Sequence, residues 1–326
     1  MIHSLSLKEA EVRFARTEFE KKMLAYSFSF ERAHFVDEEN GKVLGRISAN
    51  LSLKDPTRGY VGFFEFDLTL PDSKARAKKL IETAENWLRQ KGVKTAYGPV
   101  NYTTLFPYRF ELPRDENAKN TPVFSWEPTQ PDAYVSFFTD EGYSVADEYF
   151  SKAFDNGKVF EQSENRFKAA ESAGFKTRPM DIKANLNREL QALAKINGAS
   201  FQESFLSEPF DPQMYFALGA PQFFDKVSDF SFFLLNPAGE EIGYFFLFED
   251  QGYLVWKTLA ILPEYQKAGL SAFGMYNALL LARQKGVSKT ITALIRRGAP
   301  SEVLLARGKD LLLWEHRYAV FQKPLA

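Results

Sequence analysis

The chain has 326 residues, no cysteine, three histidines and a formal net charge of −1. The length suits two domains of roughly 150 residues each, and a domain of that size can bury a core. The lack of cysteine excludes disulfides, thiolate metal sites and a cysteine nucleophile, and the near-neutral charge excludes a general attraction to nucleic acid or anionic lipid. The histidines, His3, His34 and His316, are far apart in the sequence, so we expect no metal site.

No apolar run is long enough to cross a bilayer. The N-terminal stretch MIHSLSLKEAEVRFAR carries charges where a signal peptide needs its apolar core. We therefore expect a cytoplasmic protein, a monomer or a homodimer, that binds neither membrane nor nucleic acid.

The first half of the chain predicts a strand pair, a long strand, a helix and a further strand. Residues 34–51 (HFVDEENGKVLGRISANL) contain two β-like runs split by a turn at residues 39–41. Residues 59–70 (GYVGFFEFDLTL) are rich in aromatic and β-branched side chains, which is typical of a strand. Apolar residues then recur at helical spacing, with Asp72 or Ser73 as the cap and Gly92 just past the end. Residues 94–100 (KTAYGPV) predict the next strand.

A segment studded with proline follows, between residues 101 and 132. It contains Pro107, Pro113, Pro122, Pro128 and Pro131. A loop of this length inside a domain is often functional, and it can equally be an ordered cover over a sheet edge. Residues 137–154 (FFTDEGYSVADEYFSKAF) then predict a short helix, a glycine turn and a strand that closes the first unit.

The second half repeats this order after a linking helix at residues 159–175 and a strand that begins at residue 176. A strand pair lies within residues 230–250, split by a turn at residues 236–239, and residues 252–261 (GYLVWKTLAI) predict the long strand. A helix spans residues 269–285, and Gly286 lies just past its end. Residues 288–295 and the stretch 304–323 predict the remaining strand and the closing elements.

The pentapeptide RQKGV marks the repeat, at residues 89–93 and again at residues 283–287. The order of elements around the two copies agrees. We therefore predict an α/β (α+β) fold built from two related units, each a mixed, mostly antiparallel sheet flanked by helices. The units correspond to residues 1–157 and residues 158–326.

The stretch LPEYQKAGLSAFG, residues 262–274, lies between the long strand and the helix of the second unit. It carries no acidic side chain from Gln266 onward. The start of a helix leaves amide hydrogens unpaired and has a partial positive potential, so an anion can bind there. Gly269 permits a close approach because it has no Cβ, and Lys267 can add attraction. An ordinary strand-to-helix turn remains the alternative.

Together, the repeat and this stretch resemble the GNAT N-acetyltransferase superfamily in a tandem arrangement. The family's phosphate-binding signature is Gln or Arg, two residues, Gly, one residue, then Gly or Ala. The matching residues are Gln266, Lys267, Ala268, Gly269, Leu270 and Ser271, with serine a departure at the last position. In the first half, GKVLGRISA, GYVGFFEFD, WLRQKGVKTAYGPVN and FFTDEGY are similar to phrases of tandem bacterial members, as a degenerate copy.

The resemblance implies that the chain binds acetyl-CoA or another acyl-CoA as a substrate, with the diphosphate on the amides of residues 266–271. It also implies that Leu259, Ala260 and Ile261 offer backbone groups to the pantetheine arm, where their strand splays from its neighbour. In the first unit, alignment on RQKGV puts Asp72 opposite Gln266 and Ala75 opposite Gly269. A carboxylate facing phosphate disfavours binding, so we expect the first unit not to hold the cofactor in this way.

The expected reaction is transfer of an acyl group, most simply acetyl, to an amine that the sequence does not identify. Family members often use a strand glutamate as base and a helix tyrosine as acid. Here the strand carries only Lys257, and the tyrosine position is Leu304, so the catalytic residues are unknown. Two alternatives remain: a non-catalytic acyl-CoA-binding or scaffold protein, and an aminoacyl-tRNA-dependent peptidyl transferase of similar doubled fold.

Overall fold

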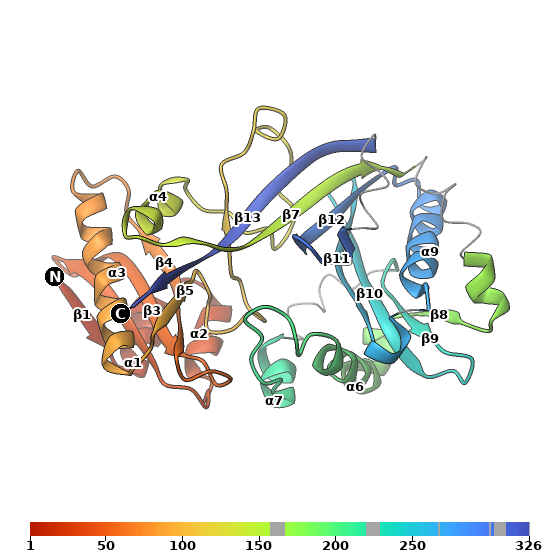
Figure 1. Ribbon diagram of the computed structural model, residues 1–326, viewed down its shortest axis with the longest axis horizontal. Helices are drawn as coiled ribbons and strands as arrows, with labels where there is room; N and C mark the ends of the chain where they lie inside the picture. Colours follow the sequence, from red (N-terminus) through yellow and green to blue (C-terminus); the bar gives the residue numbers. More distant parts are fainter. Residues whose placement is uncertain (157–166, 220–228, 267, 300, 303–310, 326) are drawn as a thin grey trace.

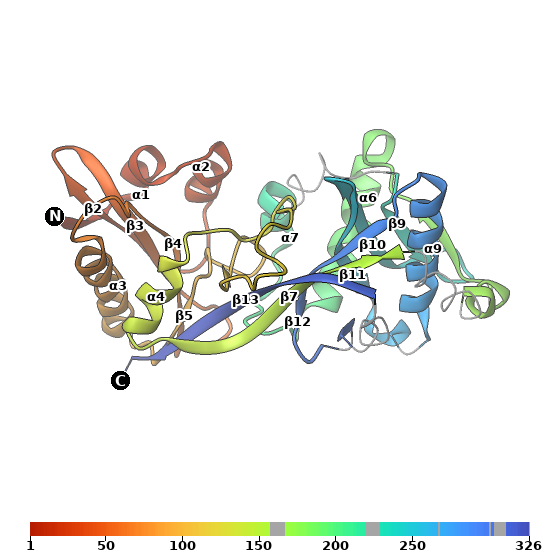
Figure 2. The same ribbon diagram turned by 90° about the horizontal axis from the view of Figure 1, so that it is seen from above.

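The computed structural model describes residues 1–156, 167–219, 229–266, 268–299, 301–302 and 311–325. Two lobes lie side by side, and two long strands, β7 (Ser144–Asp155) and β13 (Leu312–Pro324), run from one lobe to the other (Figure 1). Seen from above, β7 and β13 follow each other along this path (Figure 2), and they pair antiparallel from Leu312 to Gln322. The two strands therefore belong to both lobes.

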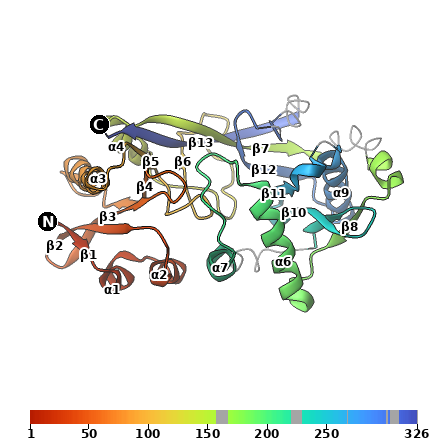
Figure 3. The same ribbon diagram turned by 60° about the horizontal axis from the view of Figure 1, so that its bottom comes forward.

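The N-terminal lobe is a sheet between two layers of helices. Figure 3 shows α1 and α2 on one face of the sheet and α3 on the opposite face. The strand residues explain this arrangement, because Phe63 packs with the α1–α2 cluster while its neighbour Phe64 packs with α3 and α4. The elements are β1 (Ile2–Leu5), α1 (Leu7–Glu9), η1 (Ala10–Phe14), α2 (Glu18–Ala25), β2 (Arg32–Glu39), β3 (Lys42–Leu51), β4 (Arg58–Phe66), α3 (Ser73–Gln90), β5 (Thr95–Gly98), β6 (Phe110–Glu111) and α4 (Ala133–Asp140).

The C-terminal lobe follows the same plan. Tyr244 of β10 donates a hydrogen bond to Asn197 of α6, 2.9 Å away, while the next residue, Phe245, lies against Gly274 of α9. The two helices therefore cover opposite faces of the sheet. The elements are β8 (Lys176–Pro179), α6 (Ile182–Ser200), α7 (Pro212–Met214), η2 (Tyr215–Gly219), β9 (Phe232–Leu235), β10 (Glu241–Asp250), β11 (Tyr253–Ile261), η3 (Pro263–Tyr265), α9 (Leu270–Gln284) and β12 (Lys289–Arg296).

The repeated order of elements predicted from the sequence is confirmed. The predicted strand pair, long strand, helix and strand are β2, β3, β4, α3 and β5 in the first half and β9, β10, β11, α9 and β12 in the second. Gly92 and Gly286 follow the two helices with φ of +83° and +75°, the left-handed conformation expected there. Each long strand runs parallel only to the strand after its helix, and the other pairs are antiparallel. The predicted mixed, mostly antiparallel sheet is thus observed.

The closing strands are exchanged between the lobes, which the sequence did not indicate. The strand order is β1-β2-β3-β4-β5-β13-β7-β12-β11-β10-β9-β8. The last strand of the chain, β13, pairs with β5 of the first half, and β7 pairs with β12 of the second half. The division at residues 157 and 158 stays a prediction, and neither half of the sequence completes a lobe without a strand from the other.

The proline-rich segment crosses between the lobes. Within it, β6 pairs with β13 through Glu111 and Tyr318, and Trp126 stacks on Phe246 of β10 at 5.8 Å between ring centroids. The segment is therefore an ordered cover, and it also delivers polar side chains to the middle of the molecule. Among the described helices, none combines the length and apolar character that crossing a bilayer requires.

Candidate functional site

An opening between β11 and β12 contains the strand residues assigned to cofactor binding. The two strands pair only from Tyr253 to Trp256, opposite Lys289 to Thr292. From Leu259 to Ile261, β11 is paired only with β10. The amide of Leu262 donates to Ile242 at 2.8 Å, so the alternation of an antiparallel ladder turns the backbone of Ala260 toward β10 and the backbones of Leu259 and Ile261 toward the opening.

The predicted phosphate loop lies at the end of this opening. Gly269 has a φ of +74°, forms the N-cap of α9, and would have nothing within 4 Å of an added Cβ. Within the described part of the chain, the amides of Gly269 and Leu270 have no hydrogen-bond acceptor, whereas the amide of Ala268 donates to Tyr265. Gln266 turns back instead, and its Nε2 donates to the carbonyl of Ile261 at 3.0 Å.

Ser271 lies in the first turn of α9, beside Leu270. The carbonyl of Ile261 also accepts from Ser200 Oγ at 3.2 Å, so the protein itself satisfies that oxygen. Lys267 and Leu304 lie outside the described residues. Leu259, Ala260 and Ile261 thus lie at one end of β11, next to Gln266, Ala268, Gly269, Leu270 and Ser271. Their assignment to cofactor binding stays a prediction.

The corresponding opening in the N-terminal lobe is filled by the chain itself. Pairing between β4 and β5 stops at Tyr60 and Tyr97, and the amide of Val100 then donates to the carbonyl of Val61 at 2.8 Å. Asn101 Oδ1 accepts from the amide of Phe63 at 2.6 Å. In the C-terminal lobe, backbone groups of the long strand face the opening. In the N-terminal lobe, the corresponding groups of Val61 and Phe63 are hydrogen-bonded to residues 100 and 101. This is a stronger reason for the first unit not to bind a cofactor than the Asp72 alignment.

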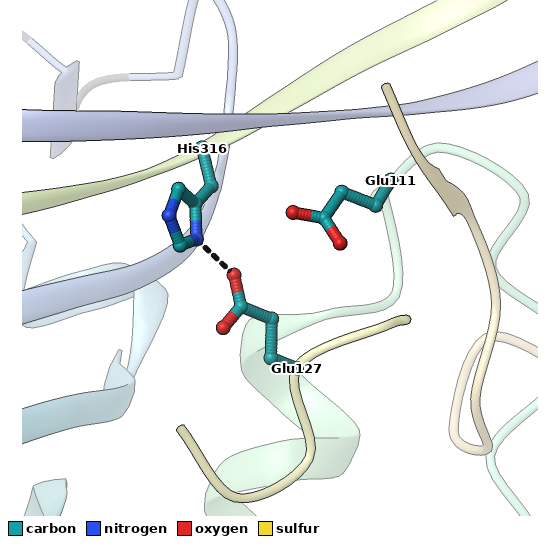
Figure 4. A group of neighbouring side chains, drawn as sticks. All are labelled: Glu111, Glu127 and His316. Atoms are coloured by element: carbon teal, nitrogen blue, oxygen red, sulfur yellow. Dashed lines mark hydrogen bonds and ion pairs between the residues drawn. The ribbon is translucent and has the colours of Figure 1, made fainter. Parts of the chain in front are cut away.

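A buried polar network lies where the proline-rich segment meets β13 (Figure 4). His316 Nδ1 is hydrogen-bonded to Glu127 Oε1, and the hydroxyl of Tyr318 donates to the same oxygen. Glu111 lies next to them and accepts from Arg114 Nε at 2.5 Å. His316 and Tyr318 are almost fully buried, at 1% and 0% exposure, so these bonds form away from water.

The partners of His316 constrain its protons. Thr121 gives its hydroxyl hydrogen to the carbonyl of Ala118 at 2.6 Å, so it can only accept from His316 Nε2, also at 2.6 Å. On the other side of the ring, Nδ1 is hydrogen-bonded to Glu127 Oε1, so both ring nitrogens of His316 have a partner inside the protein.

Glu111, Glu127 and His316 could in principle ligate a metal, because one ligand atom from each lies within 4.8 Å of the others. The partners of these three residues indicate a hydrogen-bonded network inside the protein rather than a metal site. Arg114 is ion-paired with Glu111, and Glu127 already accepts from two side chains. Burial raises the pKa of Glu111, and the hydrogen bond from Arg114 opposes that change. The network fastens the proline-rich segment to β13.

Two cationic side chains, Lys257 and Arg109, lie near the opening between β11 and β12. Lys257 is the extra residue of a β-bulge, because Phe246 pairs with Thr258 and Leu247 with Trp256. Burial, followed by the charge of Arg109, lowers the pKa of half-buried Lys257 to about 8. The guanidinium of Arg109 lies against two aromatic rings that are nearly perpendicular to each other, with its central carbon 3.9 Å from the centroid of Tyr108 and 4.1 Å from that of Tyr149.

The sequence marked few of these residues. Lys257 was visible as the only charge of its strand, and the prolines marked the segment that carries Arg109, Glu111 and Glu127. His316 had no assigned role, because its partners are distant in sequence: 189 residues separate it from Glu127. Only the fold brings them together.

Comparison with known proteins identifies the architecture. No protein-family model matches the chain. A tandem GNAT protein from the clavulanic acid biosynthesis pathway superposes with a TM-score of 0.57 at 11% identity, covering 100% of this chain and 98% of that one. A GCN5-related N-acetyltransferase from Kribbella flavida gives 0.50 at 9% identity, covering 100% and 72%. The glucosamine N-acetyltransferase region of a fungal multi-domain GH3 β-N-acetylglucosaminidase gives 0.56 at 11% identity, covering 99% and 38%.

These identities establish the fold and no more. The chain has a tandem GNAT fold, as the resemblance implied. In sequence, the chain is 25% identical over 179 residues to the bacterial ceramide synthase of Caulobacter vibrioides, a match that covers 52% of this chain and 44% of that protein. The chain thus matches less than half the length of that curated relative.

Proposed function

We propose that the protein is an acyl-CoA-dependent N-acyltransferase whose cofactor lies in the opening between β11 and β12. The observation that carries this proposal is the contrast between the lobes. Residues 100 and 101 fill the opening of the N-terminal lobe, whereas the C-terminal opening ends at a glycine and the start of a 15-residue helix. We assign the diphosphate to the loop formed by Gln266, Lys267, Ala268, Gly269, Leu270 and Ser271, and the pantetheine arm to Leu259, Ala260 and Ile261. The amides of Gln266 and Ala268 donate to Pro263 and Tyr265, so the donors to the diphosphate are those of Gly269 and Leu270, which have no acceptor among the described residues.

In the proposed reaction, an uncharged amine attacks the thioester carbonyl. The new bond is C–N, the bond that breaks is C–S, the amine nitrogen loses a proton and the coenzyme A thiolate gains one. The amide of Leu259 faces the opening and can donate to the carbonyl oxygen as charge develops on it. We assign no general acid or base.

The donor and acceptor remain to be identified by experiment. Acetyl-CoA is the simplest donor for a GNAT fold. The similarity to a bacterial ceramide synthase favours a second candidate, N-acylation with a long acyl chain, so donors of both lengths belong in the test. The protein would act as a monomer or homodimer in the cytoplasm, with no nucleic-acid or membrane partner. A non-catalytic acyl-CoA-binding or scaffold protein and an aminoacyl-tRNA-dependent peptidyl transferase are the alternatives.

Thermal unfolding with added acetyl-CoA or palmitoyl-CoA tests the binding. A ligand of the native state present at a hundred times its Kd stabilises by about 2.7 kcal/mol, which raises Tm. In Gly269→Glu, a carboxylate replaces open space at the start of α9, and we expect the rise to be lost. Gly252→Glu is the matched control, because Gly252 also has a positive φ, of +78°, and open space around it. It should keep the rise.

The assigned cofactor site would be rejected if neither donor raised Tm at millimolar concentration. It would also be rejected if Tm rose equally in Gly269→Glu and Gly252→Glu. Thiol release with a panel of amines then separates an enzyme from a binder. Binding without thiol release for any amine would favour the non-catalytic alternative.

A further inference from the structure

Arg109 and Lys257 are close enough for the charge of Arg109 to act on Lys257, and we call them the cationic pair. Within the described residues, no carboxylate pairs with either side chain, and the only hydrogen bond of the Arg109 guanidinium goes from Nη2 to the hydroxyl of Tyr108. Its Nε and Nη1 are buried without a partner. Buried charged donors of this kind are costly unless something accepts from them. Most buried donors in the protein have such a partner.

Arg46 provides the comparison within the same chain. Its side chain is 2% exposed, and it pairs with Glu20 at 2.6 Å and with Glu65 at 2.7 Å. Among the residues that the structure describes, two carboxylates thus pair with the buried Arg46 and none with Arg109, although Lys257 adds a second positive charge there. Two like charges held near each other favour an anion that comes from outside the chain.

The pair lies at the narrow end of the opening. Lys257 follows directly after Trp256, the last residue of β11 that pairs with β12. Arg109 lies over Tyr149 of β7, the strand on the other side of β12. Lys257 lies four positions before Ile261, so at ~3.4 Å per residue it lies ~14 Å along β11 from the end that meets the predicted phosphate loop. An anion here is therefore distinct from the cofactor diphosphate.

We propose that Arg109 and Lys257 bind an anionic group, a carboxylate or a phosphate, carried by the amine that accepts the acyl group. The guanidinium is planar and its Nε and Nη1 have no partner, which suits a two-oxygen anion, and Lys257 adds a second positive charge. The anion then fixes the acceptor beside the thioester, so that its amine is oriented for attack. This identification of the acceptor rests on the proposed acyltransferase function, whereas anion binding by itself does not.

The binding is tested without any acyl-CoA. The protein is labelled with isotope-enriched lysine, and the NMR signal of Lys257 is assigned by its loss in Lys257→Met. This signal is then followed as a function of pH in chloride, phosphate and succinate at equal ionic strength. A bound anion must raise the titration midpoint of Lys257. We expect a rise in phosphate, in succinate or in both, and its loss in Arg109→Gln. The anion that produces the rise distinguishes a phosphate from a carboxylate ligand. Equal midpoints in all three salts would overturn the proposal.

Selectivity is tested with amine pairs that differ in one anionic group: glycine and glycinamide, and O-phosphoethanolamine and ethanolamine. We expect kcat/KM for thiol release to be roughly tenfold or more higher for one anionic member, because charge-assisted hydrogen bonds are strong. Lys257→Met and Arg109→Gln should lose this preference while keeping the acyl-CoA effect on Tm. Lys289→Met removes an exposed charge at the start of β12. It is the control and should keep the preference for the anionic amine.

Equal rates within each pair would reject the acceptor assignment. An anion response of Lys257 without any acyl-CoA effect on Tm would leave the anion site standing and reject the acyltransferase. The failures of the two proposals are thus distinguishable.

Discussion

Buried ionisable residues in this protein differ in whether the chain supplies their partners. For Arg46, burial acts to lower the pKa, but the hydrogen bonds that it donates to Glu20 and Glu65 outweigh this effect and raise the pKa. The carbonyl of Phe14 accepts a further bond at 2.8 Å. Such a satisfied group stabilises the lobe in which it lies. Arg109 has unpaired donors instead, and this contrast at the scale of single residues is what points to a ligand.

His34 is a buried group whose protonation should govern stability in acid. It is 1% exposed, and burial, with a smaller effect of the Arg32 charge, lowers its pKa to about 3. In the unfolded chain its pKa is about 6.5. Between these values the unfolded state binds a proton that the folded state does not. The contribution of neutral His34 to the free energy of unfolding is therefore complete above pH 6.5 and is lost as the pH falls toward 3. The loss is about 1.4 kcal/mol per pH unit, or about 2 kcal/mol at pH 5.

Urea unfolding of the wild type and of His34→Gln at pH 7 and pH 5 measures this effect. We expect the wild type to lose about 2 kcal/mol more than the variant over this range. Equal losses would show that His34 is not the group responsible.

At the scale of elements, the proposed function depends on which opening between parallel strands is filled by the chain. In each lobe the long strand separates from its neighbour after a short parallel pairing. Gly62 explains why the N-terminal opening can be closed: a Cβ at this position would lie 2.1 Å from the carbonyl oxygen of Val100. Glycine on β4 therefore lets residues 100 and 101 enter the place that the C-terminal lobe leaves open.

Gly62→Ala should destabilise the protein by about 1–3 kcal/mol, because backbone cannot rotate away from the new methyl group. Ser48→Ala is the matched control. Ser48 lies opposite Gly62 on β3, and its buried hydroxyl has no partner in the described structure, so its removal should be neutral or stabilising. Chemical denaturation measures both variants. A Gly62→Ala protein as stable as the wild type would mean that residues 100 and 101 are not held in the opening.

At the scale of the whole molecule, the exchanged strands make the two lobes one cooperative unit. Unfolding the N-terminal lobe removes β5 from β13, and unfolding the C-terminal lobe removes β12 from β7. Glu208 adds a polar link, accepting from Ser52 Oγ at 2.6 Å and from the amide of Leu53 at 2.8 Å. Any pocket between the lobes is therefore shaped by both halves of the sequence.

Calorimetry should show a single thermal transition. Ile81→Ala in α3 and Leu279→Ala in α9 each truncate a buried core residue, at 0% and 2% exposure, and should each cost about 2–5 kcal/mol. Because the lobes share strands, both variants should lower the same transition and should speed hydrogen exchange in β10 of the C-terminal lobe. Two separate transitions, or an Ile81→Ala protein with unchanged exchange in β10, would contradict this coupling.

The sequence by itself determined the local elements and their repetition. The alternation of apolar residues, the turn glycines and the two RQKGV segments are short-range signals, and they located every described strand except β1 and β6, together with α3, α9 and the glycine at the start of α9. The sequence also predicted a phosphate loop at residues 266–271, and its described residues lie where the opening ends, because that prediction needed only a strand, a small-residue turn and a helix in succession.

Only the tertiary structure decided which strands pair and which side chains meet. The pattern of a strand does not specify its partner, so β7 and β13 could not be assigned to the opposite lobes from their own residues. Arg109 and Lys257 are 148 positions apart in the sequence, as distant as most of the partners in the buried network. Long-range contacts of this kind follow from packing, and the unpaired donors of Arg109 become visible only in the folded structure.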